Sequence, residues 1–117
     1  MNPKRIPSRP PEPVDAEGFH TRGNRYSRNG SYESAIADYD KAIELDPNFA
    51  DAHYDRGYSY YELGRLEEAI NDLSRAIDLN PDDDRYYAQR AVVYLFSDRM
   101  DLAQIDEEMC EELRNRG

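Results

Sequence analysis

The sequence is poor in the residues that usually build a hydrophobic core. Leu, Ile, Val and Phe make up only 20 of its 117 residues, Trp is absent, and the net charge is −10. Few such residues combined with a high net charge are typical of intrinsically disordered chains. Composition alone therefore predicts that the chain does not fold. Ten Tyr residues argue against this, because disordered segments contain few aromatic side chains.

Other absences limit the class of function. No stretch approaches the roughly 18 consecutive apolar residues of a membrane helix, and residues 1–18 lack the apolar core of a signal peptide. The single cysteine, Cys110, cannot form an internal disulfide, which fits a reducing compartment. The acidic charge argues against nucleic acid and anionic membrane as partners, since both are bound through excess Lys and Arg. We therefore expect a cytoplasmic protein.

The sequence shows no sign of catalysis. His20 and His53 are the only histidines and lie 33 residues apart, and no metal-ligand spacing, phosphate-binding glycine loop or nucleophile motif is present. The acidic triplet at residues 82–84 lacks the glycine and the bidentate Glu of a calcium loop, and is better explained as the cap and first turn of a helix. We expect no enzyme activity, no cofactor and no metal.

An internal repeat of 34 residues organises the chain. Residues 16–49 and 50–83 align without a gap and share 13 identical positions, and residues 84–117 form a third, degenerate copy. The first two copies each contain two segments of helical pattern, separated by Gly30 in one and by Gly64 in the other. The sequence thus predicts an all-α fold of three helix pairs.

The recurring residues resemble the tetratricopeptide repeat (TPR) pattern. Small and aromatic residues carry it at fixed positions in the first two copies: Phe19, Gly23, Tyr26, Ala35, Tyr39, Ala42 and Pro47, then His53, Gly57, Tyr60, Ala69, Leu73, Ala76 and Pro81. The third copy departs from the pattern, because Ala91 and Asp98 replace the two glycines and no proline closes it. The resemblance implies an α-solenoid over residues 16–117. Three antiparallel helix pairs would stack in a right-handed superhelix, with the first helix of each pair lining a concave groove.

One pair of charged positions recurs in all three copies. An arginine precedes an aspartate by sixteen residues in each: Arg22 and Asp38, Arg56 and Asp72, Arg90 and Asp106. The spacing predicts an ion pair between the first helix of a repeat and a second helix, of the same or an adjacent repeat. Two separately solvated charges are the alternative. If the pair forms, we expect Arg56→Ala to lower stability by about 1 kcal/mol.

The resemblance implies that the groove binds another protein or a peptide. Its candidate lining residues are His20, Asn24, Arg28, Tyr54, Tyr58, Tyr61, Arg85, Gln89, Val92 and Phe96. The three tyrosines follow i, i+4, i+7 spacing and form one stripe, which is either core or a recognition surface. Exposed Tyr offers a large contact area with a hydrogen-bonding tip. Because arginines flank the stripe, we expect a ligand with some acidic character.

One groove type in this family holds the acidic C-terminal tail of heat-shock chaperones through a clamp of basic and amide side chains. Asn24 and Arg85 match the clamp positions, His20 and Gln89 match poorly, and Asp55 contradicts them. The resemblance therefore favours a scaffold or adaptor module that binds a different segment. The alternatives are a small acidic chaperone for a secretion or assembly client, and a structural homo-oligomer.

The two ends of the chain differ from the repeats. In the last predicted helix Gln104, Glu107 and Glu111 occupy positions that are apolar in the earlier copies, which suggests a cap that ends the stack. On another face of that helix, Leu102, Ile105 and Met109 form a candidate homodimer contact. Residues 1–15 are rich in proline, and we expect a disordered leader, with a polyproline ligand at residues 9–13 as the alternative.

Overall fold

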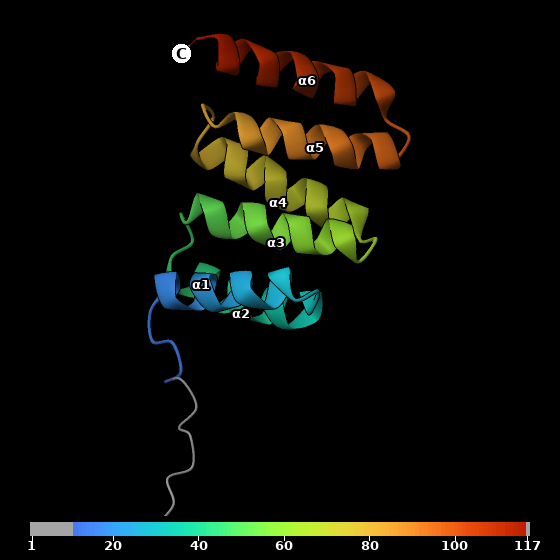
Figure 1. The fold of residues 1–117 in the computed structure, drawn as a ribbon. Coiled ribbons are helices and arrows are strands. Elements are labelled where there is room, and N and C mark those ends of the chain that lie inside the picture. The colour runs from blue at the N-terminus through green and yellow to red at the C-terminus, as the bar shows by residue number, and fades with distance from the viewer. Residues whose placement is uncertain (1–10, 117) are drawn as a thin grey trace, which may run out of the picture.

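The computed structural model describes residues 11–116, and this range contains six α-helices and no strand (Figure 1). The helices are α1 (Ala16–Arg28), α2 (Tyr32–Leu45), α3 (Ala50–Glu62), α4 (Leu66–Leu79), α5 (Asp84–Phe96) and α6 (Met100–Asn115). The predicted all-α class is confirmed. Most of the predicted leader, residues 1–10, lies outside the described residues.

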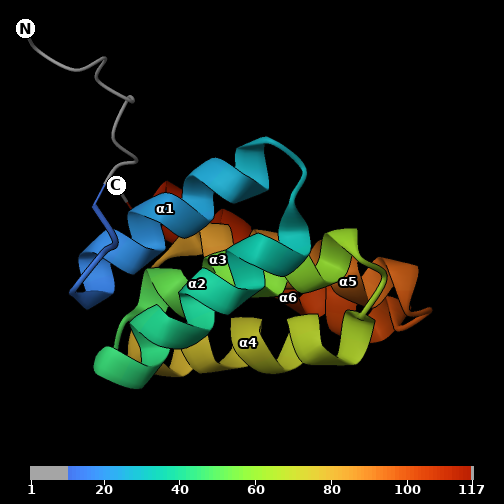
Figure 2. The same ribbon diagram turned by 90° about the horizontal axis from the view of Figure 1, so that it is seen from below.

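The helices form a solenoid of three successive pairs. Contacts are densest within α1–α2, α3–α4 and α5–α6, and the pairs join through α2–α3 and α4–α5. Seen from the α1–α2 end, the later helices lie behind the first pair (Figure 2). Among the described elements α6 packs only against α5. The first pair and α6 therefore form opposite ends of the stack (Figure 1).

The turn between the two helices of each pair depends on one residue in the left-handed backbone region. Gly30 and Gly64 have φ of 80° and 78°, which glycine adopts without a steric penalty. In the third pair Asp98 has φ 60° at the same position. Aspartate tolerates this conformation better than most residues. The degenerate third copy therefore keeps the same turn without a glycine.

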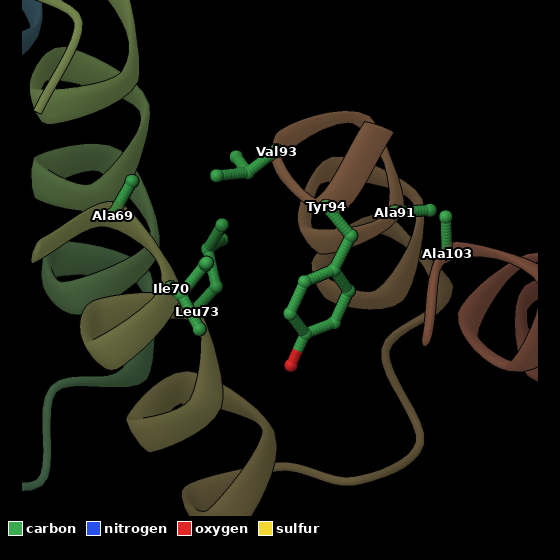
Figure 3. Close-up of a cluster of buried hydrophobic side chains, with 7 residues drawn as sticks. All are labelled: Ala69, Ile70, Leu73, Ala91, Val93, Tyr94 and Ala103. Atoms are coloured by element: carbon green, nitrogen blue, oxygen red, sulfur yellow. The ribbon is translucent and has the colours of Figure 1, made fainter. Parts of the chain in front are cut away.

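The core is built from small residues packed against large ones. Ala35, Ala42, Ala69 and Ala76 are fully buried, and Tyr39 and Tyr86 are almost as deeply buried. One cluster joins α4, α5 and α6 around Ala69, Ile70, Leu73, Ala91, Val93, Tyr94 and Ala103 (Figure 3). The prediction of disorder from composition was wrong for residues 16–116, because it counted Leu, Ile, Val and Phe while Ala and Tyr supply much of the buried surface.

Gly23 shows why this packing requires small residues. A Cβ atom at Gly23 would lie only 2.6 Å from Cε1 of Tyr39, whose side chain is fully buried and has no room to move. At Gly57 the approach is less severe, since a Cβ atom would lie 3.2 Å from Cβ of Asp72 and from Cγ of Leu73. The first and second helices of a pair can therefore touch closely only where the side chain is absent or very small.

The three arginine–aspartate pairs form as predicted, each within one repeat. Nε and Nη2 of Arg56 donate to the two carboxylate oxygens of Asp72 at 2.8 and 2.7 Å, and the pairs of Arg22 and Arg90 have the same geometry. The remaining Nη1 of Arg56 reaches back to Asp40 of the preceding pair at 2.8 Å. We call this row of six residues and its additional acceptors the arginine ladder.

Candidate functional site

The candidate groove residues come from α1, α3 and α5, and four of them surround one pocket. Asn24 and Arg28 of α1 and Tyr54 and Tyr58 of α3 line a cavity of about 350 Å³, together with Ser27, Tyr39 and Asp55. We call it the α1–α3 pocket. The repeat places α1 and α3 side by side on one face of the stack, so residues 34 positions apart meet there.

A hydrogen-bonded contact between α1 and α3 borders this pocket. Nε2 of His20 and Oδ2 of Asp55 are 2.6 Å apart, and both side chains are largely buried. The His20 ring also packs against Phe49, with centroids 4.7 Å apart. The hydroxyl of Tyr39 donates to Oδ1 of Asn24 at 2.6 Å. His20 therefore serves the contact between repeats, and one amide oxygen of the pocket already has a partner.

The tyrosine stripe of α3 divides into two parts. Tyr54 lies between repeats, where its ring is 5.1 Å from that of Tyr86 and burial raises its pKa. Tyr58 and Tyr61 are half-buried, with ring centroids 6.3 Å apart. Tyr54 packs against two buried clusters, one that contains Leu73 and one that contains Ala76, and Tyr61 packs against the first of them. Tyr58 packs against neither, and all three tyrosines remain partly exposed.

Tyr58 and Tyr61 belong to a row of rings that spans all three repeats. The ring centroids of Tyr32, in α2, and Tyr58 are 6.4 Å apart, and those of Phe96, in α5, and Tyr61 are 5.6 Å apart. We call Tyr32, Tyr58, Tyr61 and Phe96 the aromatic row. Phe96 is 67% exposed. A second cavity of about 330 Å³ opens beside it, lined by Tyr61, Glu62, Gly64, Leu66 and Phe96. Sequence reasoning missed Tyr32, because it begins α2, whereas the resemblance assigns the groove to the first helix of each pair.

Arg85, the predicted cation of the groove, is held by carboxylates. Its Nη2 donates to Oδ2 of Asp83 at 2.6 Å and to Oδ1 of Asp51 at 2.9 Å. The hydrogen bond from Arg85 lowers the pKa of Asp83. The hydroxyl of Tyr86 donates to the same Asp51 oxygen at 2.6 Å. The charge of Arg85 is therefore already balanced before any ligand arrives.

The remaining α5 candidates lie apart from the α1–α3 pocket. Gln89 is half-buried. Val92 lines a third cavity of about 390 Å³ at the α6 end of the stack, together with Ala88, Ala91, Glu107, Cys110, Glu111 and Arg114. Phe96 therefore continues the aromatic row from Tyr61, whereas Val92 faces a different cavity.

The charges of the groove are mainly negative. Asp51, Asp55 and Glu62 carry carboxylates along α3, and Asp55 and Asp51 already pair with His20 and Arg85. Among the predicted groove cations Arg28 is exposed at the end of α1. Of the arginines on which the expectation of an acidic ligand depended, Arg85 is held by two carboxylates, whereas Arg28 is exposed and lines the α1–α3 pocket. The electrostatics favour a ligand that is neutral or basic.

The candidate dimer residues lie on the outer side of α6. Leu102 and Ile105 are 43% and 59% exposed, and Met109 is half-buried. Residues 11–116 contain no group of His, Cys, Asp and Glu arranged to hold a metal ion. None of the helices described in this range is long and apolar enough to cross a membrane.

Known proteins share this fold and its repeat. The family model of the TPR repeat matches residues 23–64 and 57–95. The first TPR of Spaghetti (RPAP3), bound to HSP90 peptide SRMEEVD, is 26% identical with a TM-score of 0.84, over 88% of this chain and 82% of that chain. The second TPR of Spaghetti, bound to the same peptide, is 29% identical with a TM-score of 0.82, over 85% and 92%.

A further similar structure is that of MamA, which is 24% identical with a TM-score of 0.84. The alignment covers 87% of this chain but only 60% of that chain. At this identity the similarity shows the shared fold alone. No curated protein matches the sequence.

Proposed function

Because the chain belongs to the TPR family, we propose that it is a protein-interaction module whose concave groove binds a segment of a partner protein. The observation that carries the proposal is the α1–α3 pocket and the adjoining aromatic row. Tyr58 touches both, so one bound segment can fill the pocket and lie against the rings. Half-buried tyrosines of this kind contribute contact area at a low cost in side-chain entropy.

The similar structures support a peptide as the ligand. Both TPR domains of Spaghetti are described with a bound HSP90 peptide, SRMEEVD, on the same fold at 26% and 29% identity. In this chain Asp55 contradicts the clamp of basic and amide side chains that the family resemblance implies for an acidic tail. Its neighbour His20 is already hydrogen-bonded to it at 2.6 Å. We therefore propose a neutral or basic segment that carries an aromatic or aliphatic anchor.

The proposal can be tested with peptides of random sequence displayed on phage and selected on the immobilised chain. We expect selected peptides to carry Lys or Arg near an apolar residue. Tyr58→Ala should weaken their binding about tenfold or more, as expected when a central aromatic contact is removed. Tyr60→Ala is the matched control, because Tyr60 lies on the same helix beside the ladder residue Arg56. Equal loss with both variants, at unchanged helicity, would contradict the groove assignment.

The SRMEEVD peptide itself provides a second test. We expect no measurable binding to the wild-type chain, and measurable binding to the variant His20→Lys/Asp55→Asn/Gln89→Arg, which removes the carboxylate and adds two cations. Isothermal titration calorimetry measures both. Tight binding of SRMEEVD to the wild type would show that the groove accepts acidic tails despite Asp55.

A small acidic chaperone is the second candidate function, and exposed apolar side chains support it. Phe96 and Met100, at the turn between α5 and α6, are 67% and 61% exposed. Clustered exposed apolar residues mark binding surfaces in soluble proteins. A chaperone should bind a long unstructured client and suppress its aggregation, whereas an adaptor should bind a short defined peptide. Light scattering of an aggregating client with and without the chain separates the two.

A further inference from the structure

The two ends of the stack expose faces that the inner repeats keep covered, and the 34-residue register identifies them. Where α5 packs on α4, the α4 face consists of Ile70, Leu73 and Ile77, all buried. The corresponding residues of α6 are all exposed and polar: Gln104, Glu107 and Glu111. The exposed face of α6 thus corresponds to the α4 face on which α5 packs, but it is acidic instead of apolar.

The other end of the stack carries the opposite charge. Ser59 of α3 and Val93 of α5 are fully buried, and Val93 points towards Ala69 of the preceding pair (Figure 3). The corresponding residue of α1 is Arg25, which is exposed. In α3 and α5 this position faces the preceding helix pair. In α1 the same position holds Arg25, so the exposed face of α1 is basic there.

The arginine ladder shows how these faces could join. Nη1 of Arg56 donates to Asp40, and Nη1 of Arg90 donates to Oγ of Ser74 at 3.0 Å, in each case on the preceding pair. The next residue in this series is Glu108 of α6, an exposed acceptor for one more arginine. Within residues 11–116, Arg22 is the ladder arginine that no helix pair precedes. Its Nη1 instead donates to Glu12, whose side chain is 73% exposed.

The α6 end of the stack also has an open cavity. The cavity of about 390 Å³ between α5 and α6 has a floor of Ala88, Ala91, Val92 and Cys110 and a rim that includes Glu107 and Glu111. Ala88 and Val92 stand in the register positions of Tyr54 and Tyr58, so small side chains replace two large ones. The space that a following helix would cover is therefore open.

We propose that a second copy of this chain covers the α6 end with its own α1, so that copies join head to tail. Arg25 of the incoming copy lies over Glu107 and Glu111, and its Arg22 exchanges Glu12 for Glu108. Charge complementarity selects the second copy as the occupant, because one end face is basic and the other acidic. A contact between unlike faces leaves a free face at each end, so assembly can continue beyond two copies. The proposal does not depend on the groove.

Two variants test the proposal by blocking one end each. Arg25→Glu blocks the α1 face and leaves the α6 face intact, whereas Glu107→Lys/Glu111→Lys does the reverse. All three residues are exposed, so the fold should be retained, and circular dichroism checks this. In sedimentation velocity up to high micromolar concentration, we expect the wild type to form dimers and larger species. Each variant alone should be monomeric. An equimolar mixture should regain assembly, because the two unaltered faces match each other and the two charge-reversed faces also carry opposite charges.

Arg75→Glu is the control for a charge change away from both ends, since Arg75 is exposed on α4. It should assemble like the wild type. A wild type that stays monomeric at every concentration overturns the proposal, and so does a mixture of the two variants that stays monomeric. A dimer that survives both end variants but is lost in Leu102→Glu/Ile105→Glu also overturns it, and would place the contact on the outer side of α6.

Discussion

The first helices of the repeats present two faces that differ in how strictly they repeat. On the ladder side, Arg22, Arg56 and Arg90 are identical and make the same bidentate contact. On the groove side, the corresponding positions hold unlike residues, such as His20, Tyr54 and Ala88. A stack has to make the same inner contact in every repeat, whereas a ligand meets each repeat once. Identity between repeats therefore marks structure in this chain, and difference between them marks recognition.

Burial explains why the ladder cannot vary. Asp72 and Asp106 are only 5% and 2% exposed, and a carboxylate buried to that degree needs charged hydrogen-bond donors. The bidentate arginine supplies two of them with matching geometry. The groove residues Tyr58 and Tyr61 are half-buried and uncharged, so other residues can replace them without leaving a buried charge unpaired.

Breaking the ladder should have the largest effect on stability. Arg56→Ala leaves the buried carboxylate of Asp72 without its partner, so we expect the free energy of unfolding to fall by about 2–3 kcal/mol. This loss of stability is larger than the ~1 kcal/mol expected from the sequence, because the contact is bidentate and Asp72 is buried. Urea unfolding followed by circular dichroism measures it. Arg75→Ala, at an exposed position of α4, is the control and should change stability by less than about 0.5 kcal/mol. Equal effects would contradict the structural role of the ladder.

The ladder and the fold could be predicted from sequence because they repeat. The 34-residue spacing, read with the helical pattern and the glycine breaks, predicted three helix pairs and aligned Arg56 with Asp72 in the same way as Arg22 with Asp38 and Arg90 with Asp106. The same alignment of repeats also identifies the end faces of the stack. Arg25 and Glu107 are exposed charged residues at positions where the inner helices have buried residues. These conclusions need only the rule that corresponding positions have corresponding surroundings.

The groove could be predicted only in part, because its contacts join residues that do not correspond. His20 is hydrogen-bonded to Asp55, and Arg85 to Asp51, across neighbouring repeats. The residues at these positions differ from one repeat to the next. Whether Arg85 is free or paired depends on which acidic residues the preceding repeat carries. The same reasoning applies to Tyr54, whose burial depends on Tyr86 of the following repeat. Periodicity identifies such residues as neighbours of the groove but does not show which of them remain available to a ligand.

The tyrosine stripe offers a comparison within the groove itself. Tyr54 packs against both core clusters, whereas Tyr58 borders the α1–α3 pocket. We expect Tyr54→Ala to lower the free energy of unfolding by about 2 kcal/mol, and Tyr58→Ala by less than about 1 kcal/mol. Urea unfolding of the two variants side by side measures the difference. If Tyr58→Ala destabilised the chain as much as Tyr54→Ala, both residues would belong to the core and the aromatic row would lose its role in recognition.

The smallest effect should come from the ion pair that holds Arg85. Asp83→Asn keeps a residue that caps a helix equally well and removes only the charge, so we expect a loss of about 0.5 kcal/mol at neutral pH. The pKa of Asp83 is lowered by Arg85 in the folded chain, so this stabilisation is present above the pKa of the unfolded state. It is lost as the pH falls through the lowered pKa of Asp83. The difference between wild type and Asp83→Asn should therefore be constant above about pH 5 and vanish in strong acid. Asp82→Asn is the control at neutral pH, and it should change stability less than Asp83→Asn does, because the Asp82 side chain is 80% exposed and its contact with Arg116 is long at 3.8 Å. A difference that persists in strong acid would mean that Asp83 stabilises the helix through its hydrogen bond to the backbone rather than through the charge of Arg85.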